Sequence, residues 1–227
     1  PAKPSYATPS PRGSAPKTPI ESHGFGIANA IPLKQEVSTL YSSFLLSNFS
    51  SLEIQSILKE SNKFFPVEHI EPNELTSLSY KEIQNKLSTL NEVSLYRKKS
   101  GVYYTENDIT NFIVSNCLKL SSGIDAKSLK SRDYSNICRK TVFDPTCGSG
   151  AFLLTALELK LVASETEKVS IKQVLNSIYG NDIDETSVLI TKLRLFICIL
   201  NFAGISEIDG VSEILNSNLY SSDFFSL

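Results

Sequence analysis

The chain has 227 residues, of which 41% are hydrophobic and 20% charged, and a formal net charge of -2 at pH 7. This length fits one large domain, or a medium domain with a smaller one, and the composition is that of a globular protein. A dedicated DNA-binding module is usually basic, so any contact with nucleic acid has to come from a local patch or from other sequence.

The cysteines and the apolar segments indicate whether the protein binds zinc or a membrane. None of the four cysteines stands in a C-x-x-C pair and only two histidines accompany them, which excludes a zinc-finger-like metal site and fits a reduced, cytoplasmic protein. There is no recognisable signal peptide, and the most apolar run, around residues 193–200, is too short to span a bilayer. We therefore expect no membrane partner.

Residues 1–96 divide into a tail and a helical segment. Residues 1–33 are rich in Pro, Ser, Ala and Gly and lack periodicity, which predicts a flexible tail or linker. Residues 34–96 show helical spacing and predict a small helical subdomain. Its clearest apolar face lies in "SYKEIQNKLSTL", at Tyr80, Ile83, Leu87 and Leu90.

From about residue 97 to residue 227, predicted strands and helices alternate. Strands are expected at 141–144, 178–183 and 212–220, and helices at 150–164, 170–178 and 185–200. Alternation of this kind predicts βαβ units on a parallel sheet, and therefore an α/β domain over 97–227.

The stretch "TVFDPTCGSGAFLL" places two glycines directly behind a strand. In an open parallel sheet, ligands bind at the carboxyl ends of the strands, where Gly148 and Gly150 would allow a tight turn and a close backbone approach. A dinucleotide fingerprint does not fit, because Leu153 replaces its third glycine and Asp182 lies too far along the chain. A phosphate-binding loop does not fit either, because Ala151 and Phe152 follow the last glycine in place of Lys and Ser or Thr. Asp144, ahead of the glycines, suits a ligand with a cationic end.

Three stretches in the same order resemble a known family. "DPTCGSGAFLL", "KKSGVYYTENDITNFIV" and "IYGNDIDETSVLITKLRL" resemble motifs of the N6-adenine DNA methyltransferases of restriction–modification systems, over roughly residues 97–200. The resemblance implies a Rossmann-like, S-adenosylmethionine-dependent methyltransferase fold. It also implies S-adenosylmethionine as cofactor and the adenine N6 amine of DNA as methyl acceptor.

The resemblance also implies which residues bind the cofactor. The methionine part would be cradled by Asp144, Thr146, Cys147, Gly148 and Gly150.

The remaining cofactor contacts that the resemblance implies come from three other segments. Tyr104 and Thr105 would contact the carboxylate of the cofactor. Asp182 would accept hydrogen bonds from the ribose hydroxyls, and Ile183 would pack on the adenine. Asp223 is the candidate acceptor for the adenine amino group.

The sequence departs from the family pattern at two places. Glu106 stands where the family usually has proline, and glutamate also suits the first turn of a helix. The catalytic signature, a polar residue followed by Pro-Pro and an aromatic residue, has no counterpart here, and in the family order it would follow Leu227. We therefore assign no catalytic residue and expect the isolated chain to be inactive. In a full enzyme that flips adenine out of the duplex, DNA and a restriction or specificity subunit or domain would be the partners.

Several alternatives stay open at this point. The glycine pair could form a purely structural turn, Asp182 could cap a helix or lie in a loop, and Cys147 fits a small loop residue better than a nucleophile, because no base partner is visible. For the chain as a whole, the alternatives are a non-catalytic cofactor-binding module derived from a methyltransferase and an oxidoreductase with an atypical nucleotide loop.

Overall fold

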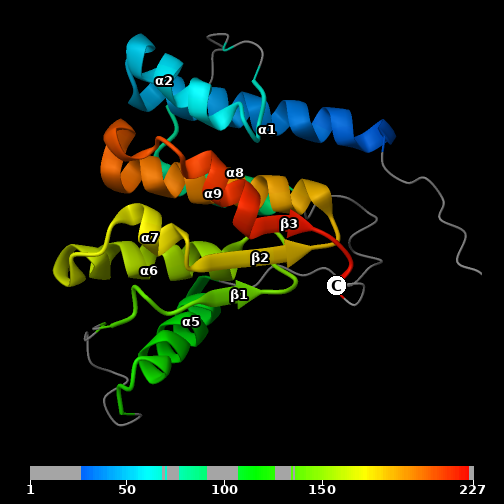
Figure 1. The fold of residues 1–227 in the computed structure, drawn as a ribbon. Coiled ribbons are helices and arrows are strands. Elements are labelled where there is room, and N and C mark those ends of the chain that lie inside the picture. Colours follow the sequence, from blue (N-terminus) through cyan, green and yellow to red (C-terminus); the bar gives the residue numbers. More distant parts are fainter. Residues whose placement is uncertain are drawn as a thin grey trace, which may run out of the picture.

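The structure, a computed structural model, describes residues 27–67, 70, 77–90, 107–125, 134 and 136–224. Its helices and strands appear in Figure 1. In chain order they are α1 (Ile27–Asn48), α2 (Ser51–Ser61), α3 (Tyr80–Leu90), α5 (Asn107–Ser121), β1 (Val142–Asp144), α6 (Ala151–Glu167), α7 (Ile171–Leu175), β2 (Ile178–Asp182), α8 (Glu185–Ala203), the 3-10 helix η2 (Gly204–Glu207), α9 (Val211–Asn218) and β3 (Leu219–Ser221).

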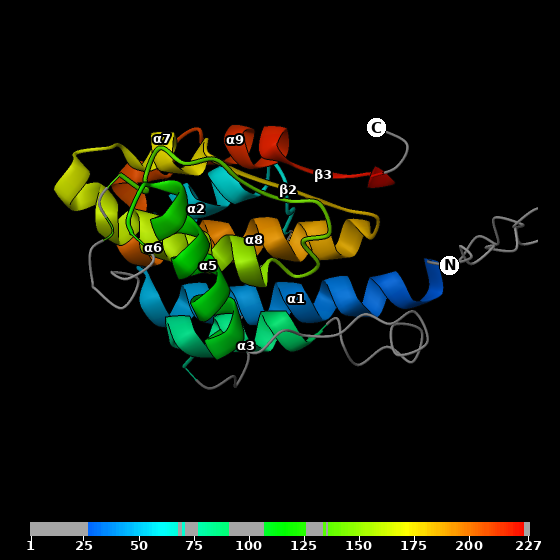
Figure 2. The same ribbon diagram turned by 90° about the horizontal axis from the view of Figure 1, so that it is seen from below.

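The three strands form a parallel sheet in the order β1-β2-β3, which confirms the predicted α/β class. Helices α6 and α8 connect successive strands and pack against each other and against the sheet. Figure 2 shows them on one side of the sheet and α9 on the other. The longest helix of each crossover thus covers the same face, as expected for consecutive right-handed βαβ units that advance in one direction.

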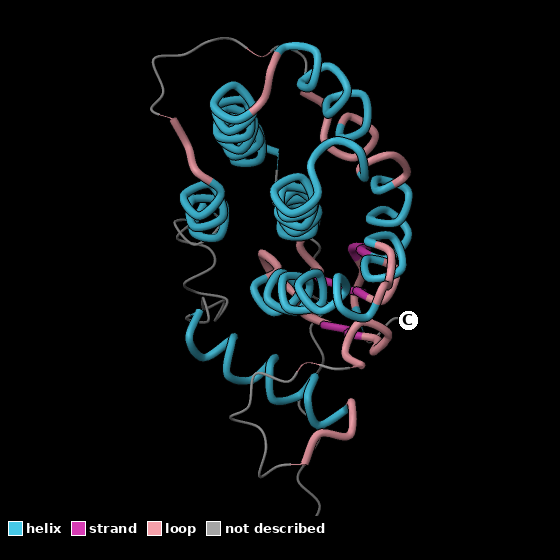
Figure 3. The backbone as a smooth tube through the Cα atoms, turned by 90° about the vertical axis from the view of Figure 1, so that its left-hand side faces the viewer, coloured by secondary structure: helices cyan, strands magenta, loops and turns pink. Residues whose placement is uncertain are grey.

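The helical segment forms a further layer outside α8. Helix α3 packs on α8 and α1 packs on α3, so the helices lie side by side when viewed nearly end-on (Figure 3). Ile83 and Leu87, on the predicted apolar face of α3, are fully buried. The ring of Phe64 meets that of Phe196 at a centroid distance of 5.6 Å, so this layer and α8 share one hydrophobic core.

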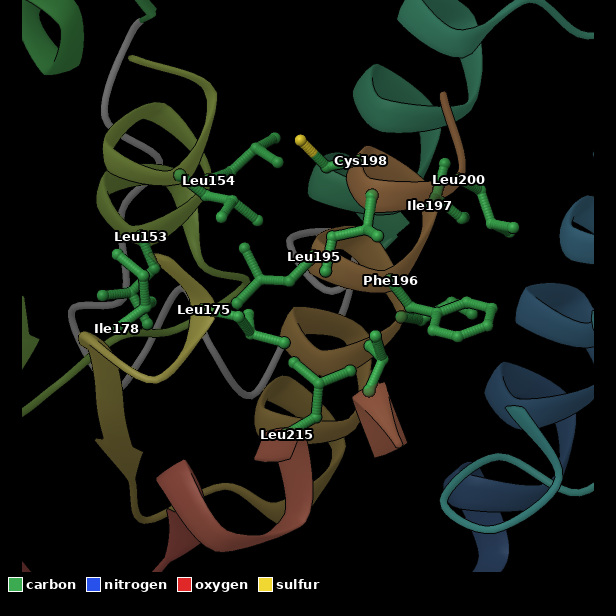
Figure 4. Packing of buried hydrophobic residues seen from close by; sticks show 14 of the residues in the cluster. Leu153, Leu154, Leu175, Ile178, Leu195, Phe196, Ile197, Cys198, Leu200 and Leu215 are labelled. Carbon is green, nitrogen blue, oxygen red and sulfur yellow. The ribbon is translucent and has the colours of Figure 1, made fainter. Parts of the chain in front are cut away.

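Helix α8 forms the centre of that core. Leu195, Phe196 and Ile197 are all fully buried, and Figure 4 shows Phe196 on the side of α8 that faces away from Leu153 and Leu154 of α6 and Ile178 of β2. By length and composition alone, the stretch Glu185–Glu207 is apolar enough to cross a membrane, contrary to the sequence-based expectation for this region. Its most apolar window has a mean hydropathy of 1.9, and 61% of that window is buried inside the structure. Packing on both sides accounts for its composition.

The structure corrects the third predicted strand. Of residues 212–220, most belong to helix α9, and the strand β3 starts only at Leu219. The physical reason is spacing: Val211, Leu215 and Asn218 recur at helical intervals and all three are buried. Helix α1 also begins at Ile27, inside the segment expected to be a tail.

Candidate functional site

The carboxyl ends of β1 and β2 meet at one edge of the sheet. Asp144 is the last residue of β1 and Asp182 the last residue of β2, and the two strands pair in parallel with Asp144 opposite Gly180. The loop of residues 145–150, the glycine loop, leaves β1 at this edge and leads into α6. The structure therefore brings together the two acidic residues and the glycine pair that the sequence singles out.

Hydrogen bonds to β2 fix the backbone of the glycine loop. The Cys147 N–H donates to the Asn181 carbonyl at 2.8 Å, and the Gly148 N–H donates to Asp182 Oδ2 at 2.8 Å. Asp182 Oδ1 accepts from the Asp184 N–H at 2.9 Å. Asp182 thus clamps the loop, a role the sequence analysis missed. Each carboxylate oxygen has a second lone pair, so its predicted contact with ribose hydroxyls stays compatible with these bonds.

The two glycines have different surroundings. Gly148 has φ +54, and a Cβ atom there would meet nothing within 4 Å. Gly150 has φ +79, and a Cβ atom there would lie 2.7 Å from Thr191 Cγ2. The Thr191 hydroxyl donates to the Gly148 carbonyl at 2.9 Å. Gly150 therefore allows close packing of the loop on α8, whereas the loop is open on the side that Gly148 would present to a ligand.

Asp144 lies in an environment that disfavours its charge. Burial raises the pKa of its carboxyl above the ordinary value of 3.8, and the neighbouring Asp182 raises it further. A hydrogen bond from the Thr146 N–H at 3.1 Å acts in the opposite direction on the pKa. A cationic group bound here would relieve the repulsion between the two carboxylates, in line with the preference inferred from the sequence.

Cys147 is buried and poorly suited to be a nucleophile. Burial raises the pKa of its thiol to about 12, and Asp144 and Asp182 contribute in the same direction. A Cβ atom placed on Gly180 would lie 3.3 Å from Cys147 Sγ, so the thiol packs over β2. This geometry favours the small loop residue of the sequence analysis, with any ligand contact made by the backbone.

The two acidic residues at the turn after β2 have different roles: one caps α8 and the other does not. Asp184, not Asp182, caps α8, because its side chain accepts hydrogen bonds from the Thr186 N–H at 3.3 Å and the Ser187 N–H at 3.2 Å. Ile183 lies between the two acidic residues and is 76% exposed. The predicted adenine contact is therefore an apolar side chain available to a ligand.

Asn181 links the loops that follow β1 and β3. Its Nδ2 donates to the Ser222 carbonyl at 3.0 Å and to the Pro145 carbonyl at 3.4 Å, and its Oδ1 accepts from the Ser222 N–H at 3.1 Å. Asp223, the candidate adenine contact, directly follows Ser222 and is exposed. The structure thus places Asp223 in the loop that Asn181 holds at this edge of the sheet.

Two predicted contacts cannot be located. Tyr104 and Thr105 lie outside the described residues, as does Glu106. The described part resumes with α5 at Asn107, which agrees with the helix expected after this motif.

Polar residues on α8 are the main site residues that the sequence analysis missed. Their spacing was the signal, since polar residues that repeat at helical intervals in an apolar helix mark one face. Asp184, Ser187, Thr191 and Arg194 follow at intervals of three, four and three residues. The last three are buried, so this face points toward protein.

The comparisons with known proteins give a consistent assignment. The family model described as N-6 DNA methylase matches residues 88–223. A curated relative, the methylase subunit of the Type I restriction enzyme MjaIX from Methanocaldococcus jannaschii, is 34% identical over 100 residues, which cover 44% of this chain and 14% of the relative. The chain thus aligns with a small part of that subunit. No solved structure matches.

Proposed function

Since the chain belongs to the N-6 DNA methylase family, we propose that its α/β part binds S-adenosylmethionine at the carboxyl edge of the sheet. In this proposal the sheet, α6 and α8 are part of a Rossmann-like methyltransferase fold. The cofactor supplies an activated methyl group when bound. The residues of this chain bind it and orient it.

The observation that carries the proposal is the position of Gly148. Its positive φ and the open space around it leave the loop accessible, while Asp182 holds its N–H from the neighbouring strand. A ligand can therefore approach the loop backbone without displacing a side chain. This is the arrangement expected of a glycine at a ligand-binding turn between a parallel strand and a helix.

The donor and acceptor chemistry of the site also fits this cofactor. S-adenosylmethionine carries a sulfonium and an ammonium group, and Asp144 and Asp182 form a negatively charged pair whose repulsion a cation would relieve. Asp182 retains acceptor capacity for ribose hydroxyls, and exposed Ile183 offers an apolar surface to adenine. We propose Thr146, Cys147 and Gly150 as further contacts of the methionine part, and Tyr104, Thr105 and Asp223 as contacts of the carboxylate and the adenine amino group.

For the protein that contains this segment, we propose methyl transfer to adenine N6 in DNA as part of a restriction–modification system. The name of the archaeal relative, a restriction enzyme methylase subunit, supports this proposal and suggests DNA and a restriction or specificity subunit as partners. A cytoplasmic location is part of the same proposal. Catalysis would consist mainly of positioning the target amine against the methyl group.

Isothermal titration calorimetry on the 227-residue chain tests the cofactor assignment. We expect S-adenosylmethionine and its demethylated product to bind in competition, and NAD not to bind. The control is Gly148→Val, which fills the open side of the loop and strains a positive φ, and which should abolish binding. Binding of NAD instead would favour an oxidoreductase. Cofactor binding without methyl transfer in any longer form of the protein would favour a non-catalytic module.

A further inference from the structure

A buried arginine in α8 forms a hydrogen bond to the backbone of the glycine loop. The guanidinium of Arg194, 4% exposed, donates through Nη1 to the Ser149 carbonyl at 2.5 Å. Ser149 lies between the two glycines with positive φ, so this carbonyl belongs to the turn itself. A charged donor makes a stronger hydrogen bond than a neutral one, which makes Arg194 an effective anchor for the turn.

The orientation of that guanidinium depends on a residue of the helical layer. Arg194 Nε donates to Gln84 Oε1 at 3.0 Å, and Gln84 Nε2 donates in return to the Arg194 carbonyl at 2.9 Å. Gln84 lies in α3 and is 5% exposed. Because Nε and Nη1 lie in one rigid plane, fixing Nε on Gln84 also sets the direction in which Nη1 points.

This connection reaches the loop from outside the part of the chain that the family model matches. The match begins at residue 88, whereas Gln84 precedes it in α3. The pair of hydrogen bonds joins α3 to α8, and Arg194 continues from α8 to Ser149. Thr191, one turn earlier on α8, binds the carbonyl of Gly148. Two successive carbonyls of the turn are thus held by α8, and one of the two donors is oriented by α3.

We propose that Gln84 and Arg194 are positioning residues for the glycine loop, so that helix α3 contributes to cofactor affinity without touching the cofactor. The inference rests on the proposed S-adenosylmethionine site. Its physical basis is preorganisation: a glycine-containing turn has many accessible conformations, and a ligand binds more tightly when the protein already holds the productive one. Loss of the Gln84 side-chain amide also leaves the buried Nε–H of Arg194 without this acceptor, which would shift the guanidinium toward other acceptors.

The test compares two variants of the same helix. Gln84→Leu removes both hydrogen bonds to Arg194 while keeping a side chain of similar size. Tyr80→Phe is the matched control, because it removes the hydrogen bonds of the Tyr80 hydroxyl, with Glu158 Oε1 of α6 at 2.5 Å and with the Cys198 thiol of α8, and leaves the loop contacts intact. Gln84→Glu keeps an acceptor for Arg194 Nε but loses the donor to the Arg194 carbonyl, so it should restore the orientation of the guanidinium only in part.

Two readouts separate positioning from general stability. Without any ligand, hydrogen–deuterium exchange of the loop peptide should be faster in Gln84→Leu than in Tyr80→Phe. The comparison is made at temperatures equally far below the melting temperature of each variant, so that a difference in global stability does not contribute. The dissociation constant of S-adenosylmethionine should rise about tenfold in Gln84→Leu, change less than about twofold in Tyr80→Phe, and be partly restored in Gln84→Glu.

The outcomes also separate this inference from the proposed function. Unchanged loop exchange in Gln84→Leu, or equal loss of affinity in both α3 variants, overturns the positioning role. If the unmodified chain does not bind S-adenosylmethionine, the proposed function fails, and the exchange measurement still decides whether Gln84 holds the loop.

Discussion

Gly150 packs so closely on Thr191 that a Cβ atom at position 150 would lie 2.7 Å from Thr191 Cγ2 and 2.8 Å from its Oγ1. The contact ties the start of α6 to the middle of α8, and Thr191 is itself fully buried. Its branched side chain has little rotameric freedom in a helix, so it cannot easily move aside. The need for glycine at position 150 therefore comes from packing as well as from its φ.

We predict that Gly150→Ala destabilises the fold more than Gly148→Ala. At Gly148 the cost is that of a positive φ alone, about 1–2 kcal/mol, because a Cβ atom there meets open space. At Gly150 overpacking against Thr191 adds about 1–3 kcal/mol. Urea denaturation measures both. In a Thr191→Ala background the excess cost of Gly150→Ala should fall without vanishing, because Thr191 Cβ itself would lie 3.1 Å from the added atom. An unchanged excess would show that the Thr191 side chain is not its cause.

Asp182→Ala and Asp182→Asn should both weaken S-adenosylmethionine binding, by about 1–3 kcal/mol. The amide is not a conservative replacement here. Both carboxylate oxygens accept backbone N–H groups, from Gly148 and Asp184, and an amide nitrogen at either position would face a donor. Calorimetry gives the affinities. Glu185→Gln, which removes a charge from an exposed position in the first turn of α8, is the control and should bind normally. Full affinity in either Asp182 variant would remove Asp182 from the site.

The sequence predicted the parts of the site that lie close along the chain or at strand ends. Asp144 and Asp182 come together because parallel neighbouring strands end at the same edge, a rule that requires no coordinates. Gln84 could not be assigned, because its partner Arg194 lies 110 residues away and their meeting depends on how α3 packs on α8. Helix α9 was predicted as a strand because a short apolar segment is ambiguous until one of its faces is seen to be buried.

Affinity for S-adenosylmethionine should rise with pH in the acidic range. The pKa of Asp144 is raised above 3.8 by burial and by Asp182, so the carboxyl keeps its proton to a higher pH than an ordinary aspartate. Only the ionised form attracts a cationic ligand, and binding should strengthen as pH increases through the raised pKa. Calorimetry across this range should show the increase in the unmodified chain. Asp144→Asn should show a smaller one, and identical pH profiles would exclude Asp144 as the titrating group.

Lys160 should make stability depend on pH in the alkaline range. It is fully buried and donates from Nζ to the Lys140 carbonyl and to the Ser177 hydroxyl. Burial lowers its pKa from 10.5 to about 8. Between these values the unfolded chain binds more protons than the folded one, so the free energy of unfolding should increase with pH, by up to about 3 kcal/mol over the full window. Below about pH 8 the penalty for burying the charge is present in full.

The measurement for Lys160 is the difference in unfolding free energy between the unmodified chain and Lys160→Met. Other groups titrate in the same range, and the difference removes those that both proteins share. Urea denaturation at about pH 8 and about pH 10 should show the unmodified chain gaining stability relative to the variant. A difference that does not change with pH would show that Lys160 keeps an ordinary pKa or is reached by water.

The 227-residue chain alone should transfer no methyl group to DNA. It contains no Pro-Pro pair, so the segment that would hold a flipped adenine in this family is not among its residues, and its net charge of -2 does not favour strong binding to a duplex. The assay is transfer of a tritiated methyl group to mixed-sequence DNA, with an established N6-adenine methyltransferase as positive control. If N6-methyladenine forms, and Asp182→Ala prevents it, the activity belongs to this chain and the catalytic residues lie within the 227.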